Sequence, residues 1–190
     1  MGKSIFSRYA VPFFQWYALM ILLTIAIDYF LHRNQLLLVG RYLGYIGTGL
    51  VTASFIYSLR KRKIIKSGAP KKLLSLHEYL AWAGSVMVLV HAGIHFNALL
   101  PWLAVFMLLV VVASGLVGKF LLQKSNETLK EKREILISSG LSLQEADNKL
   151  FFDSFTVDLM KKWRSIHMPV TIILFVLVLI HVVTIVMFTK

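Results

Sequence analysis

Four histidines share one spacing in the sequence. His77 and His91 lie in one apolar stretch, and His167 and His181 lie in another, each pair in the pattern H-x13-H. On an α-helix, fourteen residues are about 21 Å of rise and close to four turns, so both imidazoles of a pair would lie on nearly the same face. Since a membrane hydrocarbon core is about 30 Å thick, each helix would hold one histidine near each side of it.

Pairing by depth predicts two bis-histidine sites, His77 with His167 and His91 with His181. Two imidazoles are too few for structural zinc, which takes four protein ligands, or for catalytic zinc, which usually takes three. Haem supplies four equatorial nitrogens itself and needs only axial ligands. The chain has no cysteine, so covalent attachment through C-x-x-C-H is excluded. We therefore expect two non-covalent haems b, with these four histidines as the iron ligands.

His95 offers an alternative ligand for the outer site. It lies eighteen residues from His77, which is five full helical turns, so it faces the same way. We prefer His91 because only that choice gives both helices equal spacing. A different interpretation makes the histidines polar links between helices or a proton relay, as in a non-redox metal or proton transporter.

Glycines near the histidines have two interpretations. Gly84 lies midway between His77 and His91 and on almost the same face, so we include it as a cofactor-binding position where a flat macrocycle approaches the backbone. Glycine is also common where membrane helices pack closely. The pattern Gly40-x-x-x-Gly44 favours that packing role in the preceding helix.

Asp28 and His32 form a second polar pair, one helical turn apart. An acid and a histidine on one face could accept protons from a quinol. The alternative is an interfacial pair that meets water.

The composition predicts a membrane protein. Hydrophobic residues make up 57% of the 190 residues, against about 45–50% in soluble domains. Several apolar runs exceed the roughly 18 residues that mark a spanning helix, and the first is too long for a signal-peptide core. We expect an all-α bundle of five transmembrane helices forming one membrane domain over residues 1–190. The expected spans are 9–31, 36–59, 73–99, 101–122 and 163–188.

The net charge of +12 predicts orientation. Lysine and arginine crowd the second and fourth loops, whereas the third has neither. By the positive-inside rule the N-terminus is inside, the C-terminus is outside, and the protein is multi-pass in the cytoplasmic membrane. Nucleic acid is a poor interpretation of this charge. The cytoplasmic loop 124–160 is expected to be a helical hairpin with a capping box at Ser142-x-x-Glu145, either solvated or docking a partner.

The segments LSLHEYLAWAGSVMVLVHAGIH and WRSIHMPVTIILFVLVLIHVV resemble the haem-bearing helices of dihaem membrane cytochromes b. The similar groups are ferric-reductase-like transmembrane domains and the cytochrome b subunits of respiratory oxidoreductases. The resemblance covers residues 73–188 well and the first two helices loosely. It implies that His77, His91, His167 and His181 are haem ligands.

The chain departs from the ferric-reductase pattern in two ways. Those enzymes often have six helices and a fused flavin and nicotinamide module, whereas five helices are expected here and no G-x-G-x-x-G loop is present. No independent catalytic module is therefore expected. We interpret the chain as an electron-transfer subunit of a membrane oxidoreductase, with soluble or peripheral redox subunits as partners. Quinone remains an open candidate for electron exchange.

Overall fold

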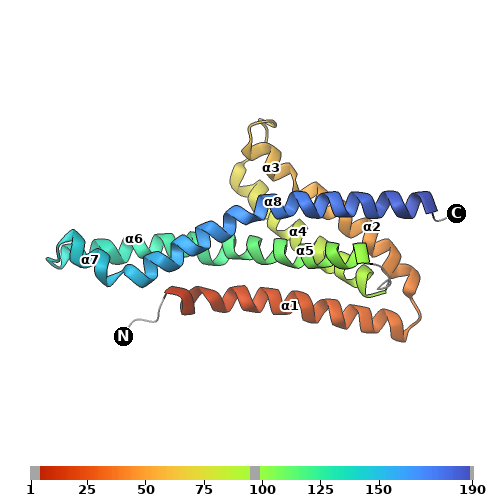
Figure 1. Ribbon diagram of the computed structural model, residues 1–190, viewed down its shortest axis with the longest axis horizontal. Coiled ribbons are helices and arrows are strands. Elements are labelled where there is room, and N and C mark those ends of the chain that lie inside the picture. Colours follow the sequence, from red (N-terminus) through yellow and green to blue (C-terminus); the bar gives the residue numbers. More distant parts are fainter. Residues whose placement is uncertain (1–4, 95–98, 189–190) are drawn as a thin grey trace. The chain divides into compact units, whose positions relative to one another are not determined.

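The protein is all-helical, as the sequence predicts. The computed structural model describes residues 5–94 and 99–188, and these form helices joined by short turns, with no strand among them (Figure 1). The chain forms two compact units. One contains Met1–Tyr17 and Ala113–Thr171, and the other contains Ala18–Val112 and Ile172–Lys190. Three helices pass from one unit to the other: α1 (Ile5–Arg33), α5 (Leu99–Leu116) and α8 (Phe151–Phe188).

Within the described residues, four helices are long and apolar enough to cross a membrane. This supports a multi-pass membrane protein. Helix α2 (Leu37–Ser54) is not among the four, although a span was expected there. Its glycines, tyrosines and Arg41 lower its mean hydropathy. The four candidate spans are Ala10–Arg33, Pro70–Gly93, Leu99–Phe120 and Asp153–Phe188.

The division of the chain into helices differs from the sequence prediction most clearly in three places. The stretch expected as one helix over 36–59 is divided at Phe55 into α2 and a short α3 (Ile56–Lys61). The stretch expected over 101–122 ends as the π-helix η1 (Val117–Leu122), which runs directly into α6 (Gln123–Ser138). Helix α8 begins at Phe151 rather than near residue 163, and Val157 in this added part is buried rather than solvated.

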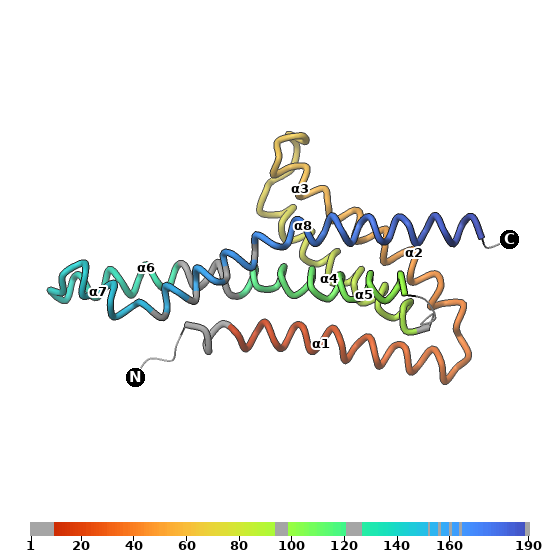
Figure 2. The backbone as a smooth tube through the Cα atoms, in the orientation of Figure 1, coloured from red at the N-terminus to blue at the C-terminus, as the bar shows by residue number. Residues whose placement is uncertain are grey.

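In the second unit, α2 packs antiparallel against α4 (Pro70–Ile94), and Figure 2 traces both segments. The two backbones touch at Gly47 and Gly84. A Cβ atom added to either glycine would lie 2.8 Å from the carbonyl oxygen of the other. Only residues without a side chain permit this approach. The loop between the helices is tied by Arg60, whose Nε donates to the Gly68 carbonyl oxygen at 3.1 Å.

In the first unit, α6, α7 (Leu143–Lys149) and the first turns of α8 form the expected helical hairpin (Figure 2). The predicted capping box is confirmed: Ser142 Oγ accepts from the Glu145 backbone N–H, and Glu145 Oε2 accepts from the Ser142 N–H at 2.9 Å. Val157 is fully buried on α8. Phe13, Val117, Phe120 and Leu129 pack against it.

Candidate functional site

Both histidines of α4 are oriented by backbone carbonyls of α2. His77 Nδ1 lies 3.0 Å from the carbonyl oxygen of Ser54, and His91 Nδ1 lies 3.1 Å from that of Gly40. A carbonyl oxygen only accepts hydrogen bonds, so in each histidine the Nδ1–H is the donor. Both rings are partly buried on the face of α4 that meets α2.

The two bonds and the glycine contact share one antiparallel register. Along α2 the positions are Gly40, Gly47 and Ser54, and along α4 they are His91, Gly84 and His77. Successive positions are seven residues apart on both helices, which is close to two full turns. The spacing of the two histidines is thus matched by the spacing of the two carbonyls that hold them.

This bonding pattern prepares the opposite nitrogen for a metal. In a neutral imidazole with the proton on Nδ1, Nε2 carries the free lone pair. Metal-ligating histidines almost always donate their other ring N–H to a carbonyl, a carboxylate or water, which fixes the tautomer and ring orientation. The donor chemistry of His77 and His91 therefore fits axial ligation through Nε2.

Each α4 histidine also has a distinct neighbour. The Tyr57 ring lies 5.6 Å from the His77 ring between centroids, tilted by 33°. The His91 ring lies directly against Gly44, where an added Cβ atom would be 2.6 Å from His91 Cγ. Sequence reasoning treated Gly44 as a helix-packing glycine. Its contact is a histidine ring, and the Gly40-x-x-x-Gly44 pattern alone could not distinguish these roles.

Gly84 faces α2. A Cβ atom there would meet Val51 Cγ2 and the Gly47 carbonyl oxygen, both at 2.8 Å. The missing side chain therefore permits close helix packing. The expected clearance for a macrocycle at Gly84 stays a prediction.

His167 lies on α8 in the first unit, next to α5. Its Nδ1 is 2.7 Å from Ser114 Oγ, and Ser114 is almost fully buried. Gly115 is close as well, since an added Cβ atom would lie 3.7 Å from His167 Cε1. Sequence reasoning missed Ser114. The available indication was a small polar residue in an otherwise apolar helix.

His181 and His95 are the remaining candidate ligands. His181 is partly buried on the part of α8 that belongs to the second unit, the unit of His77 and His91. His95 lies outside the described residues. The pairings of His77 with His167 and of His91 with His181 stay predictions.

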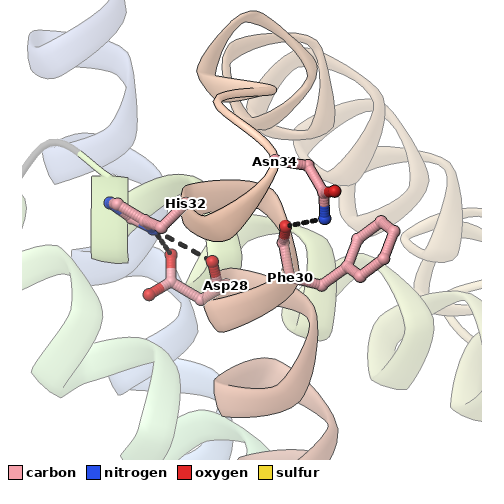
Figure 3. A network of polar contacts seen from close by, with 4 residues as sticks. All are labelled: Asp28, Phe30, His32 and Asn34. Atoms are coloured by element: carbon pink, nitrogen blue, oxygen red, sulfur yellow. Dashed lines mark hydrogen bonds and ion pairs between the residues drawn. The ribbon is translucent and has the colours of Figure 1, made fainter.

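Asp28 and His32 form the second polar feature, on α1 (Figure 3). His32 Nδ1 lies 2.9 Å from the Asp28 backbone oxygen and 3.4 Å from Asp28 Oδ1. Within the described part of the chain, that Oδ1 is buried and accepts no hydrogen bond. It faces α4 at Gly93, where an added Cβ atom would lie 2.9 Å from it. A buried carboxylate oxygen in an apolar helix is a functional candidate in its own right.

Over residues 5–94 and 99–188, no three histidine, cysteine, aspartate or glutamate side chains gather as a metal site. Haem differs from a bare ion because it asks the protein only for axial ligands. Comparisons with known protein families, curated proteins and solved structures find no match. The functional argument therefore rests on the residues of this chain.

Proposed function

We propose that this chain is a dihaem b-type cytochrome that carries electrons across a membrane as a subunit of a larger redox complex. The observation that supports it most is the bonding of His77 and His91 through Nδ1 to α2 carbonyls. It gives both imidazoles the tautomer in which Nε2 is the nitrogen that can bind a metal, at positions about 21 Å apart along α4. That separation covers much of a hydrocarbon core of about 30 Å.

In this proposal His77 and His167 hold one haem b and His91 and His181 hold the other. When bound, the haems supply reversible one-electron chemistry. The chain itself contributes the ligand tautomer, through the Ser54 and Gly40 carbonyls, and apolar helices that exclude water. The absence of cysteine means that packing and axial ligation retain the haems.

The proposed topology has five spans: the four candidate spans given above and α2. Its 18 residues correspond to about 27 Å, and its antiparallel contact with the apolar helix α4 extends from Gly40 to Ser54. The exposed basic residues that follow α3 support a cytoplasmic position for the α3–α4 loop. The N-terminus then lies inside and the C-terminus outside.

The proposed partners are soluble or peripheral redox subunits. The 190 residues contain no dinucleotide-binding glycine motif and no cysteine for an iron–sulfur cluster, so the proposal places the two-electron chemistry outside this membrane domain. The hairpin over 124–160 is the proposed docking region. Its exposed apolar side chains support this assignment. They include Ile135, Leu143, Phe151 and Phe155. Quinone is a further proposed electron donor or acceptor.

The second candidate function is a metal or proton transporter without haem. The buried Oδ1 of Asp28, which accepts no hydrogen bond from the described residues, favours it, because ionisable groups inside membranes often belong to proton pathways. A visible spectrum decides between the two functions. A transporter would purify without haem absorption.

The test begins with the purified protein in detergent. We expect two low-spin haems b per chain, both released by acid–acetone, and one haem or none would overturn the proposal. In sealed vesicles, an impermeant reductant on one side should reduce both haems and then an acceptor on the other side. If each haem responds only to reagents on its own side, transmembrane transfer is excluded.

A further inference from the structure

We infer that α2, which carries no ligand, is the positioning element for both α4 histidines, and that Gly47 on α2 and Gly84 on α4 are the positioning residues. The inference deepens the proposed function, on which its redox readout rests. It is carried by the contact of the two glycines midway between the two histidine–carbonyl bonds.

The first step is steric. An added Cβ atom at Gly47 would lie 2.8 Å from the Gly84 carbonyl oxygen and 2.9 Å from Met87 Cβ. Both atoms belong to α4, and a carbonyl oxygen in a helix cannot swing away as a flexible side-chain end can. A methyl group at Gly47 must therefore push α2 and α4 apart.

The second step links that separation to the histidines. The bonds to His77 and His91 lie seven residues to either side of the glycine contact, in the same register. At 3.0 and 3.1 Å both bonds have ordinary N–H···O lengths, and the range of good geometry ends at about 3.2 Å, so a separation of a few tenths of an ångström weakens both. One change at Gly47 thus affects both sites.

The third step concerns the iron. A carbonyl that accepts from Nδ1–H makes the imidazole a more basic ligand. A more basic ligand favours ferric over ferrous iron and lowers the midpoint potential, since second-shell hydrogen bonding is one of the protein's means of tuning haem. Weakening the bonds should therefore raise the potential of both haems.

Gly44 provides a selective counterpart. An added Cβ atom there would lie 2.6 to 2.8 Å from His91 Cγ, Nδ1 and Cδ2. No α4 backbone atom is among its three nearest contacts, so the ring must move rather than the helix. Gly44→Ala should disturb the His91 haem and spare the His77 haem.

The experiment is a redox titration of the purified haem protein carrying Gly47→Ala, Gly44→Ala or Gly49→Ala. Gly49 is the matched control on the same helix, because an added Cβ atom there meets nothing within 4 Å. We expect Gly47→Ala to raise both potentials. A tenfold loss of ferric relative to ferrous affinity, at the low end of second-shell effects, corresponds to about 59 mV. Gly44→Ala should move one potential and Gly49→Ala neither.

A second readout separates this inference from the proposed function. Histidine-selective ¹⁵N NMR of the same preparations, reduced if haem is bound, reports whether Nδ1 carries the proton. We expect Nδ1–H on His77 and His91, with faster hydrogen exchange at both in Gly47→Ala.

If haem binds but Gly47→Ala and Gly49→Ala have the same haem potentials and the same Nδ1–H exchange rates, the positioning role is wrong and the proposed function is unaffected. If no haem binds but the NMR pattern appears, the function fails and the positioning role stands. If Gly47→Ala does not fold, an unchanged His91 signal in Gly44→Ala overturns the inference.

Discussion

Ser114 Oγ lies 2.7 Å from Nδ1 of His167, and the hydroxyl is buried between α5 and α8. If His167 binds iron through Nε2, its Nδ1 carries the proton and the serine oxygen accepts it. Ser114 would then accept the Nδ1–H bond of His167 and fix its tautomer, as the α2 carbonyls do for the histidines of α4. The difference is that a side chain, rather than a backbone group, provides the acceptor, so mutation can remove it.

We expect Ser114→Ala to weaken the haem held by His167 by about 10- to 100-fold, the usual cost of losing a second-shell partner. Haem titration of the purified variant measures this affinity. The control is Ser85→Ala. Ser85 is about equally buried, and its hydroxyl donates to the Ala81 carbonyl oxygen within its own helix. Equal haem affinity in the two variants would contradict the proposed role of Ser114.

Pairing by depth predicts which variants share a phenotype. His77→Ala and His167→Ala should each remove the same spectral component, about half of the haem absorbance, because a bis-histidine haem loses its low-spin state with either ligand. His91→Ala and His181→Ala should remove the other component. Low-temperature optical spectra and redox titrations resolve the two.

Two outcomes would contradict this pairing. Loss of one and the same component in His77→Ala and His181→Ala would mean that the topology is wrong. Loss of the outer haem in His95→Ala, with His91→Ala unaffected, would make His95 the ligand.

The capping box of α7 predicts a pH dependence outside the membrane. Hydrogen bonds from the Ser142 backbone N–H and side chain hold the pKa of Glu145 below its ordinary value of 4.5. A carboxylate with a lowered pKa stabilises the folded state fully above the ordinary pKa, and this contribution is lost as the pH falls through the lowered value. Protection factors from hydrogen exchange in the first turn of α7 should therefore fall below about pH 4.5.

Glu145→Gln provides the control for that pH dependence. Glutamine can still accept the Ser142 N–H bond, since the capping box tolerates either residue. The variant should keep a cap at neutral pH while losing the acid-dependent change in protection. An identical pH profile in the wild type and Glu145→Gln would exclude Glu145 as the titrating group.

Two ion pairs connect α6 to the segments that follow it, and they should differ in how much they stabilise the hairpin. Lys132 Nζ to Asp153 Oδ2 and Arg133 Nη2 to Asp147 Oδ2 both measure 2.7 Å, but the Asp153 side chain is 17% exposed and the Asp147 side chain 55%. Exposed pairs contribute roughly 0–1 kcal/mol. Asp153→Asn should therefore open the hairpin more than Asp147→Asn. Limited proteolysis measures this, and equal cleavage rates would contradict the ranking.

Much of the helical layout could be predicted from the sequence, because apolar length and helical capping are local properties. Ser142 and Glu145 are three residues apart, and their capping box was predicted and is confirmed. The early start of α8 was not predicted. It depends on the burial of Val157 against Phe13 and Leu129, which are distant in sequence. The break at Phe55 likewise has no glycine or proline to mark it.

The sequence by itself determined the membrane class of the protein and the equal spacing of His77 with His91 and of His167 with His181, since both are properties of composition and helical repeat. Only the tertiary structure decided which ring nitrogen of the α4 histidines is committed to a hydrogen bond. The acceptors are backbone carbonyls 23 and 51 residues away along the chain. Every residue has a carbonyl, so no residue type marks the ones that matter, and only the register of α2 on α4 selects them.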